Sequence, residues 1–379
     1  MTAPQTAAYK FGMLSGALKN AGDFLIVQRS EELLKSVYPN AEFHVYNRCK
    51  NLDGYLYELN KMDALILCGG PLYISRLYPD GFPVSDLDRL QAPLFALGMG
   101  WFGRDGTAKT VYRYRLEDTT IRLLKRIEQD TGTLGCRDWY SVNVLRNNGV
   151  WSGKMTGCPA WYHPEFLTQQ DFSNGSPGQI HKICISDPAN TDSLEQMVAL
   201  AAYLRQLFPK AEIKAVFHRG LKADTYTEKN VAHLTAQAAA ACEKLGLECL
   251  DISYGYTGFS VYDHCDLQIG YRVHAHIYNL SRRNLSILIE EDGRGAGVNH
   301  ALGLERITAY DFGLRTSTGE DRVSATIEKT ENTGLLQWVD DYLNNLYQTD
   351  FLQIRNAFRL MQGYYKQMEQ HLAGLSAYI

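Results

Sequence analysis

Short apolar runs alternate with amphipathic stretches along the first half of the chain, and the two patterns predict different elements. Apolar runs of four to six residues have the length of strands, whereas apolar positions such as Ile26, Leu33, Leu34 and Val37, three to four residues apart or adjacent, predict a helix. The predicted strands span residues 9–14, 41–46, 64–67 and 93–98, and the predicted helices span residues 22–37, 53–60, 119–129 and 141–147. This alternation predicts a parallel, doubly wound α/β sheet.

The same alternation restarts after residues 168–180, a polar segment with Gly, Ser, Pro and Asn that we interpret as a linker. Strands are predicted at residues 183–186, 213–217, 248–252 and 286–289, and helices at residues 193–207, 231–245 and 273–280. We therefore expect two domains, at residues 1–167 and 181–331, and a helical tail at residues 332–379 that packs back on the N-terminal domain. Ligands of open α/β sheets bind beyond the carboxyl ends of the strands, so the cleft between the domains is the expected site.

Composition and charge narrow the classes of function. The 379 residues are 45% apolar, and 38 Lys and Arg against 42 Asp and Glu give a formal charge of −4. This balance predicts no nucleic-acid partner, and no apolar run approaches the roughly 18 residues of a membrane-spanning helix. The N-terminus lacks the basic and apolar segments of a signal peptide, and the eight scattered cysteines favour reduced thiols over zinc or disulfide sites. We therefore expect a cytoplasmic protein.

Glycines and one carboxylate lie near the predicted ends of the early strands. Gly69, Gly70 and Gly100 occupy positions where a glycine either makes a tight turn or lets a ligand approach the backbone. Asp23 lies at the start of the first predicted helix, where its local chemistry favours an N-terminal cap over a hydrogen bond to a substrate hydroxyl. Each of these residues taken alone has a structural explanation.

The most informative segment follows Gly270, the predicted end of a strand. Arg272 and His274 lie at the start of a predicted helix. An arginine side chain at a helix N-terminus is suited to bind a carboxylate or a phosphate, and a histidine titrates near neutral pH. A surface arginine beside a core histidine is the structural alternative. His276 lies about 200° further around the helix and is expected to point into the domain.

Two further polar segments also follow predicted strand ends. His218 and Arg219 come after one strand, and Glu290, Glu291 and Asp292 come after another, just before Arg294. Solvated loops would explain each segment singly. Their shared position at strand carboxyl ends favours one common site.

A series of short motifs occurs in a fixed order between residue 20 and about residue 294. The motifs are Asn20, Gly22 and Asp23 (N-x-G-D), Asp63 to Gly69-Gly70, Gly98-Met99-Gly100, Arg137-Asp138 with Ser141 and Leu145, Gly157-Cys158-Pro159-Ala160, Cys265-Asp266 with Ile269-Gly270, and Arg272-x-His274-Ala275-x-Ile277. In order and spacing this series resembles the polysaccharide pyruvyl transferase family. The chain departs from the family pattern after Gly100, where G-P is frequent, and at Arg294, where a lysine is frequent.

The resemblance implies two Rossmann-like domains that face a cleft, as in GT-B glycosyltransferases. It also implies transfer of a pyruvyl ketal from phosphoenolpyruvate, on the C-terminal domain, to two hydroxyls of a saccharide, on the N-terminal domain. The product would serve exopolysaccharide or cell-envelope assembly, and a lipid-linked acceptor would bring the protein to the inner face of the membrane. The sequence leaves open the sugar, its lipid or nucleotide carrier, and whether the chain forms a homo-oligomer.

Ketal formation sets requirements that the implied site residues can meet. The donor's methylene carbon needs an acid, the sugar hydroxyls need a base, and the carboxylate and phosphate need fixed positive charge. We expect His274 to transfer protons, Arg272 to clamp the donor and Asp23 to orient an acceptor hydroxyl. Arginines can neutralise the leaving phosphate, so no metal and no tightly bound cofactor is expected. The further candidates for substrate binding are Asn20, Gly22, Gly69, Gly70, Gly100, Arg137, His218, Arg219, Glu290 and Arg294.

Two other functions fit the same sequence. A GT-B-like glycosyltransferase would bind a nucleotide sugar through the same arginines, and binding of a nucleotide diphosphate without phosphoenolpyruvate would indicate it. A non-catalytic glycan-binding subunit would bind sugar without turnover and would tolerate the loss of His274.

Overall fold

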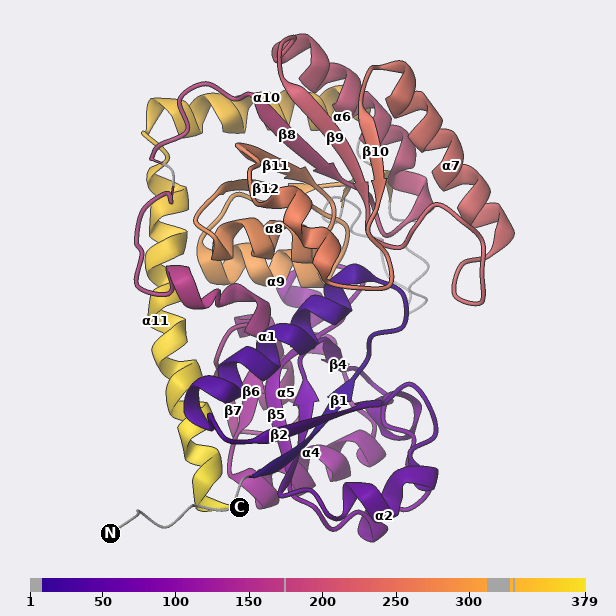
Figure 1. The fold of residues 1–379 in the computed structure, drawn as a ribbon, viewed down its shortest axis with the longest axis vertical. Coiled ribbons are helices and arrows are strands. Elements are labelled where there is room, and N and C mark those ends of the chain that lie inside the picture. Colours follow the sequence, from indigo (N-terminus) through magenta and orange to yellow (C-terminus); the bar gives the residue numbers. More distant parts are fainter. Residues whose placement is uncertain (1–8, 174, 312–327, 330) are drawn as a thin grey trace.

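The computed structural model describes residues 9–173, 175–311, 328–329 and 331–379, which form two parallel sheets with helices packed around them (Figure 1). The strands of the first sheet all precede the predicted linker, and those of the second sheet all follow it. The predicted fold class, two doubly wound α/β units, is therefore confirmed.

The N-terminal sheet has the strand order β2-β1-β3-β5-β6-β7, with β4 paired to β5, and every pairing is parallel. Its strands are β1 (Lys10–Ser15), β2 (Glu42–Asn47), β3 (Ala64–Cys68), β4 (Pro71–Tyr73), β5 (Leu94–Trp101), β6 (Leu134–Cys136) and β7 (Gly153–Met155). Its helices are α1 (Ala21–Val37), α2 (Leu56–Leu59), α3 (Ala108–Arg113), α4 (Asp118–Thr131) and α5 (Trp139–Asn147).

The C-terminal sheet repeats this plan with the order β10-β9-β8-β11-β12-β13. Its strands are β8 (Lys182–Ser186), β9 (Glu212–Phe217), β10 (Glu248–Asp251), β11 (Leu267–Gly270), β12 (Leu285–Glu290) and β13 (Ile307–Thr308). Its helices are α6 (Leu194–Leu207), α7 (Lys229–Lys244), α8 (Val273–Ser281) and α9 (Gly293–Leu302). A small antiparallel pair, β14 (Tyr310–Asp311) and β15 (Glu328–Lys329), lies outside both sheets.

The local sequence explains where these elements begin, end and bury their side chains. All five residues of β3 are buried, as expected for a central parallel strand, and α1 buries Leu25, Ile26, Leu33 and Leu34 on one face. Asp138 caps α5, because its Oδ1 accepts a hydrogen bond of 2.7 Å from the backbone N–H of Ser141. Such a cap stabilises a helix by about 1 kcal/mol.

Two of the predicted elements differ clearly from the structure, and several short elements were not predicted, among them β4, β6, β7, β13, α3 and α9. β5 continues through Gly98 to Trp101 instead of ending at Gly98, because Gly98 takes a φ of +60° and the pairing with β6 shifts register there. The helix predicted at residues 53–60 is a short 3₁₀ turn followed by the four residues of α2.

The C-terminal tail consists of two helices, α10 (Asn332–Gln348) and α11 (Leu352–Gly374), of which α11 contacts both domains. α10 packs against α6 and β13 of the C-terminal domain, and α11 then runs along one side of the molecule to the N-terminal domain (Figure 1). There His371 donates a hydrogen bond of 2.8 Å from Nε2 to the carbonyl of Ala96 and stacks on Phe95. The Tyr38 hydroxyl donates to the carbonyl of Leu372 at 2.9 Å. The predicted return of the tail to the N-terminal domain therefore holds for α11.

In the described ranges, none of the helices is long and apolar enough to cross a membrane.

Candidate functional site

Loops at the strand carboxyl ends of both sheets enclose a cavity of about 250 Å³ between the two domains. The N-terminal domain contributes residues that follow β1, β2, β3 and β6, and the C-terminal domain contributes residues that follow β8, β9, β11 and β12. The predicted site residues that line this cavity are Asn20, Asp23, Arg137, His218, Arg219, Arg272, His274 and Arg294. Most of the candidates therefore lie together, as expected from the rule that ligands of open α/β sheets bind beyond the carboxyl ends of the strands (the strand-end rule).

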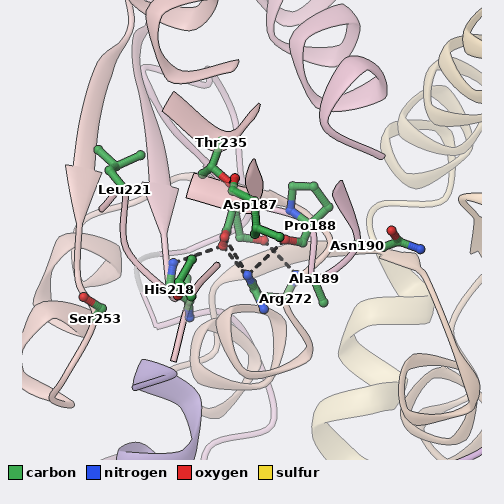
Figure 2. A network of polar contacts seen from close by, with 12 residues as sticks. Asp187, Pro188, Ala189, Asn190, His218, Leu221, Thr235, Ser253 and Arg272 are labelled. Carbon is green, nitrogen blue, oxygen red and sulfur yellow. Dashed lines mark hydrogen bonds and ion pairs between the residues drawn. The ribbon is translucent and has the colours of Figure 1, made fainter. Parts of the chain in front are cut away.

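Arg272 is held by a carboxylate of its own domain, as Figure 2 shows. Its Nε and Nη2 donate hydrogen bonds of 2.7 Å and 2.6 Å to the two oxygens of Asp187, and Nη2 also donates to the carbonyl of Pro188 at 2.9 Å. The backbone N–H of His218 donates to Asp187 Oδ1 at 3.0 Å. Asp187 therefore ties the ends of β8 and β9 to the start of α8. The sequence predicted an open arginine fork for a donor, whereas in the structure Asp187 occupies that fork.

His274 lies on the cavity wall at the start of α8 and packs against α1. A Cβ atom built on Gly22 would lie only 2.4 Å from its Nδ1, so the absence of a side chain at Gly22 makes room for the imidazole. Its Nε2 is buried and has no hydrogen-bond partner among the described residues. Burial, and next the positive charge of Arg137, hold the pKa of His274 well below its ordinary value. The imidazole is therefore neutral at pH 7.

The two other histidines of this region each have one ring nitrogen in a hydrogen bond. Their second ring nitrogens, His276 Nε2 and His218 Nδ1, are buried without a partner among the described residues, like His274 Nε2. His276 Nδ1 forms a hydrogen bond of 2.7 Å with Ser286 Oγ inside the C-terminal domain, which confirms the predicted helix register. His218 is fully buried, its Nε2 lies 2.7 Å from the Tyr262 hydroxyl, and burial lowers its pKa well below the ordinary value. The carbonyl of His218 accepts a hydrogen bond of 3.0 Å from the backbone N–H of Ala21, so this residue also joins the two domains.

Asp23 is not the cap of α1, although local chemistry favoured that role. The capping position is Asn20, and Asp23 is the third residue of the helix. Its side chain lines the cavity instead, and burial raises the pKa of its carboxyl. The alternative in which Asp23 meets a substrate hydroxyl is the one compatible with this position.

Three of the predicted substrate-binding glycines support other side chains and do not line the cavity. A Cβ on Gly69 would lie 2.7 Å from Ile26 Cγ2, so Gly69 allows α1 to pack on the sheet. A Cβ on Gly100 would lie 2.2 Å from Arg137 Cζ, so Gly100 makes room for that guanidinium. Gly70, with a φ of +79°, has the guanidinium of Arg48 as its neighbour. The close approach expected at these glycines is made by neighbouring side chains of the protein.

Within the acidic loop, Glu291 lines the cavity and the predicted Glu290 does not. Glu290 is fully buried, pairs with Arg306 at 2.8 Å and accepts a hydrogen bond of 3.0 Å from Asn299 Nδ2, away from the cavity. The next residue, Glu291, lines the cavity and accepts the backbone N–H groups of Ala189 and Asn190 at 2.6 Å and 3.0 Å. Burial raises the pKa of Glu291 to about 7. A group that titrates near neutral pH therefore stands at the place expected for Glu290.

A larger cavity of about 590 Å³ adjoins the first one and shares part of its wall. Residues common to both are Ala189, Arg219, Arg272, Glu291, Asp292 and Arg294. Arg294 pairs with Asp292 at 2.6 Å and lies over the ring of Phe102, which is 42% exposed. No group of three or more His, Cys, Asp or Glu placed to hold a metal ion occurs in the described part of the chain.

Comparison with known proteins finds a family model that matches part of the chain and solved structures with a similar fold. The family model described as polysaccharide pyruvyl transferase matches residues 20–193. The resemblance to this family is confirmed. The match covers the N-terminal domain from α1 onward and β8 of the second sheet, and both β1 and the Arg272-x-His274 motif lie outside it. Comparison with the sequences of curated proteins gives no match.

Solved structures similar to this chain have glycosyltransferase-like folds. The S. aureus MnaA–UDP co-structure aligns with a TM-score of 0.53 at 10% identity, over 98% of each chain. A trehalose-6-phosphate synthase studied with bisubstrate glycomimetics aligns with a TM-score of 0.50 at 11% identity, over 97% of this chain and 99% of that chain. The GT-B-like arrangement expected from the pyruvyl transferase resemblance is confirmed, and family and fold together support a transferase.

Sequence reasoning missed several residues that line this pyruvyl transferase-like cavity. Lys19, Arg48 and Glu291 are in its wall, and Asp187 holds Arg272 in place. Arg48 directly follows β2 and Asp187 directly follows β8. The strand-end rule that selected the other candidates would have found both.

Proposed function

We propose that this protein transfers a pyruvyl group from phosphoenolpyruvate to two hydroxyls of a saccharide, forming a ketal. The observation that carries the proposal is the unpartnered Nε2 of His274, buried in a cation-lined cavity between two domains of a chain that matches the pyruvyl transferase family. A buried basic nitrogen without a partner is a costly feature that a reacting hydroxyl would satisfy.

The charge of the small cavity suits a three-carbon donor with a carboxylate and a phosphate. Arg137, Arg272 and Arg294 belong to its wall, and each is fixed by a carboxylate neighbour. Preorganised positive charge of this kind stabilises negative charge that develops on a leaving group. These arginines would therefore act on the departing phosphate without moving.

The reaction balances with proton transfers alone. One proton adds to the methylene carbon of the donor, and the first hydroxyl oxygen bonds to the adjacent carbon and loses its proton. The bond from that carbon to the phosphate oxygen then breaks, phosphate leaves, and the second hydroxyl oxygen takes its place and releases a proton. His274, neutral and with an unpartnered Nε2, is the group we assign to accept the hydroxyl proton, once the anionic donor offsets the positive charge of the arginines around it. Glu291, with a pKa of about 7, is suited to supply the proton for carbon.

The larger adjoining cavity suits the saccharide. Phe102 from the N-terminal domain and Tyr226 from the C-terminal domain are both partly exposed in its wall, and aromatic rings of this kind pack against sugar faces. The acceptor would then contact both domains rather than the N-terminal domain alone. A lipid or nucleotide carrier on the acceptor, and a role in exopolysaccharide or cell-envelope assembly at the inner face of the membrane, are parts of this proposal.

The test is incubation of the purified protein with phosphoenolpyruvate and a panel of saccharide acceptors. The expected result is acceptor-dependent release of inorganic phosphate and an acceptor mass increased by one pyruvyl ketal. Phosphate release without any mass change in the acceptor would contradict the proposal. Binding of a nucleotide diphosphate without any turnover of phosphoenolpyruvate would select a glycosyltransferase instead.

A further inference from the structure

The small cavity contains a buried cation that lacks the carboxylate partner its neighbours have. Six basic side chains line the cavity, and four of them pair with carboxylates: Lys19 with Asp224, Arg137 with Asp138, Arg272 with Asp187, and Arg294 with Asp292. Among the described residues, the remaining two, Arg48 and Arg219, have no ion-pair partner. Arg219 is exposed, whereas Arg48 is only 8% exposed.

The chain builds a slot for the Arg48 guanidinium. A Cβ on Gly16 would lie 2.5 Å from its Nη2, and Cβ atoms on Gly70 and Gly81 would lie 3.5 Å and 4.0 Å from its terminal nitrogens. The backbone N–H of Arg48 donates to the carbonyl of Ser15 at 2.9 Å, which fixes the residue at the end of β2. The guanidinium is thus held in a defined place at the cavity wall.

The hydrogen bonds of this guanidinium are far from complete. Nη1 donates to the carbonyl of Gly81 at 3.2 Å, and the buried Nε has no partner among the described residues. An arginine side chain carries five N–H donors and stays charged in proteins. Burial lowers the pKa of Arg48 and the nearby carboxylate of Asp23 counters that shift, but these two described side chains form no ion pair. Burying a charge without a bonded counter-ion is unfavourable, so a folded chain that keeps it there is expected to meet an anion.

We propose that Arg48 binds an oxyanion of the three-carbon donor. Arg48 would then have the donor-binding role that the sequence predicted for Arg272. The inference rests on the proposed function for the identity of the donor. Arg272 already has its two-pronged contact in Asp187, whereas Arg48 presents an unfilled planar fork of the kind that fits a carboxylate or a phosphate. Arg48 comes from the N-terminal domain and His274 from the C-terminal domain, so the donor would bridge the two.

Titration calorimetry with phosphoenolpyruvate tests this inference on the full-length protein and on the Arg48→Gln variant. We expect the affinity of the variant for phosphoenolpyruvate to fall about tenfold to hundredfold, because one or two charge-assisted hydrogen bonds are lost. Competition with inorganic phosphate and with pyruvate identifies the end of the donor that Arg48 holds. Loss of phosphate binding assigns the phosphate, and loss of pyruvate binding assigns the carboxylate; either result supports the inference.

Gly16→Ala provides an independent variant that keeps the charge. The new methyl group would displace the guanidinium from its slot, so donor affinity should fall while the residue that binds the anion is still present. This variant carries the test if Arg48→Gln does not fold. Arg29→Gln is the matched control, because Arg29 is a similarly buried arginine of the N-terminal domain, 7% exposed, that pairs with Glu32 and does not line the cavity.

Three results separate this inference from the proposed function. Unchanged affinity for phosphoenolpyruvate in a folded Arg48→Gln protein, with only a lower melting temperature, would assign Arg48 a structural role and overturn the inference alone. An equal loss of affinity in Arg29→Gln would overturn it as well. Phosphate binding that depends on Arg48 in a protein that never turns over phosphoenolpyruvate would refute the proposed function and leave the anion site standing.

Discussion

His274 and His276 form a matched pair of histidines on one helix, and their alanine variants should fail in opposite ways. His274 Nε2 has no hydrogen-bond partner among the described residues, and its ring borders an existing cavity, so His274→Ala removes no bond from Nε2 and opens no enclosed void. His276 is 1% exposed and its Nδ1 bonds Ser286 Oγ at 2.7 Å, so His276→Ala leaves both a void and a hydroxyl that has lost a partner.

The expected magnitudes follow from these contacts. Loss of a proton-transfer group lowers the rate by about 10²–10⁴, which corresponds to roughly 2.7–5.5 kcal/mol of barrier. The stability of His274→Ala should stay within about 1 kcal/mol of the parent protein. His276→Ala should lose roughly 2–4 kcal/mol of unfolding free energy, from the cavity and the lost hydrogen bond together.

The assay combines phosphate release at saturating phosphoenolpyruvate and acceptor with urea unfolding of each variant. His274→Ala should unfold at nearly the parent urea concentration and show almost no phosphate release, whereas His276→Ala should unfold earlier and retain turnover at low temperature. Near-normal turnover in His274→Ala would refute the assignment of proton transfer to this residue. The reverse pattern between the two variants would refute the reasoning from helix register.

Two further predictions concern buried carboxylates of the same site. Asp187→Asn should cost roughly 3–5 kcal/mol of unfolding free energy, because it leaves the buried Arg272 charge without its partner. In urea unfolding, the double variant Asp187→Asn/Arg272→Met should lose less stability than the two single variants together. Burial raises the pKa of Glu291 from 4.5 to about 7, so the folded protein binds more protons than the unfolded chain in that range and loses stability as the pH rises through it. Glu291→Gln should remove up to about 3 kcal/mol of that loss between pH 5 and pH 8, and an unchanged pH dependence of urea unfolding would contradict the assignment.

Much of the fold could be predicted from the sequence because periodicity reports directly on burial. The five consecutive buried residues of β3 and the apolar face of α1 each have one compatible secondary structure. The extension of β5 to Trp101 could not be predicted from the sequence. A glycine such as Gly98 is compatible both with a turn that ends the strand and with a bulge through which the strand continues.

The site could be predicted as a set of residues but not as a set of contacts. Strand-end position brought Arg137, Arg272 and His274 to one cavity, since it depends on topology alone. Which partner each charge meets depends on long-range packing: Glu290 pairs with Arg306, sixteen positions away, and the neighbouring Glu291 faces the cavity. A sequence does not show which of two adjacent carboxylates points inward.

The course of α11 has a consequence for how the chain is made. The first domain leaves the ribosome early, yet the contacts of His371 with Phe95 and Ala96 and of Leu372 with Tyr38 come from α11, whose residues follow their hydrogen-bond partners by 275 and 334 positions. Domains generally acquire structure in the order of their synthesis, but this one is covered only after α11 has been made. During translation the nascent N-terminal domain therefore exposes the surface around Phe95 until His371 of α11 covers it.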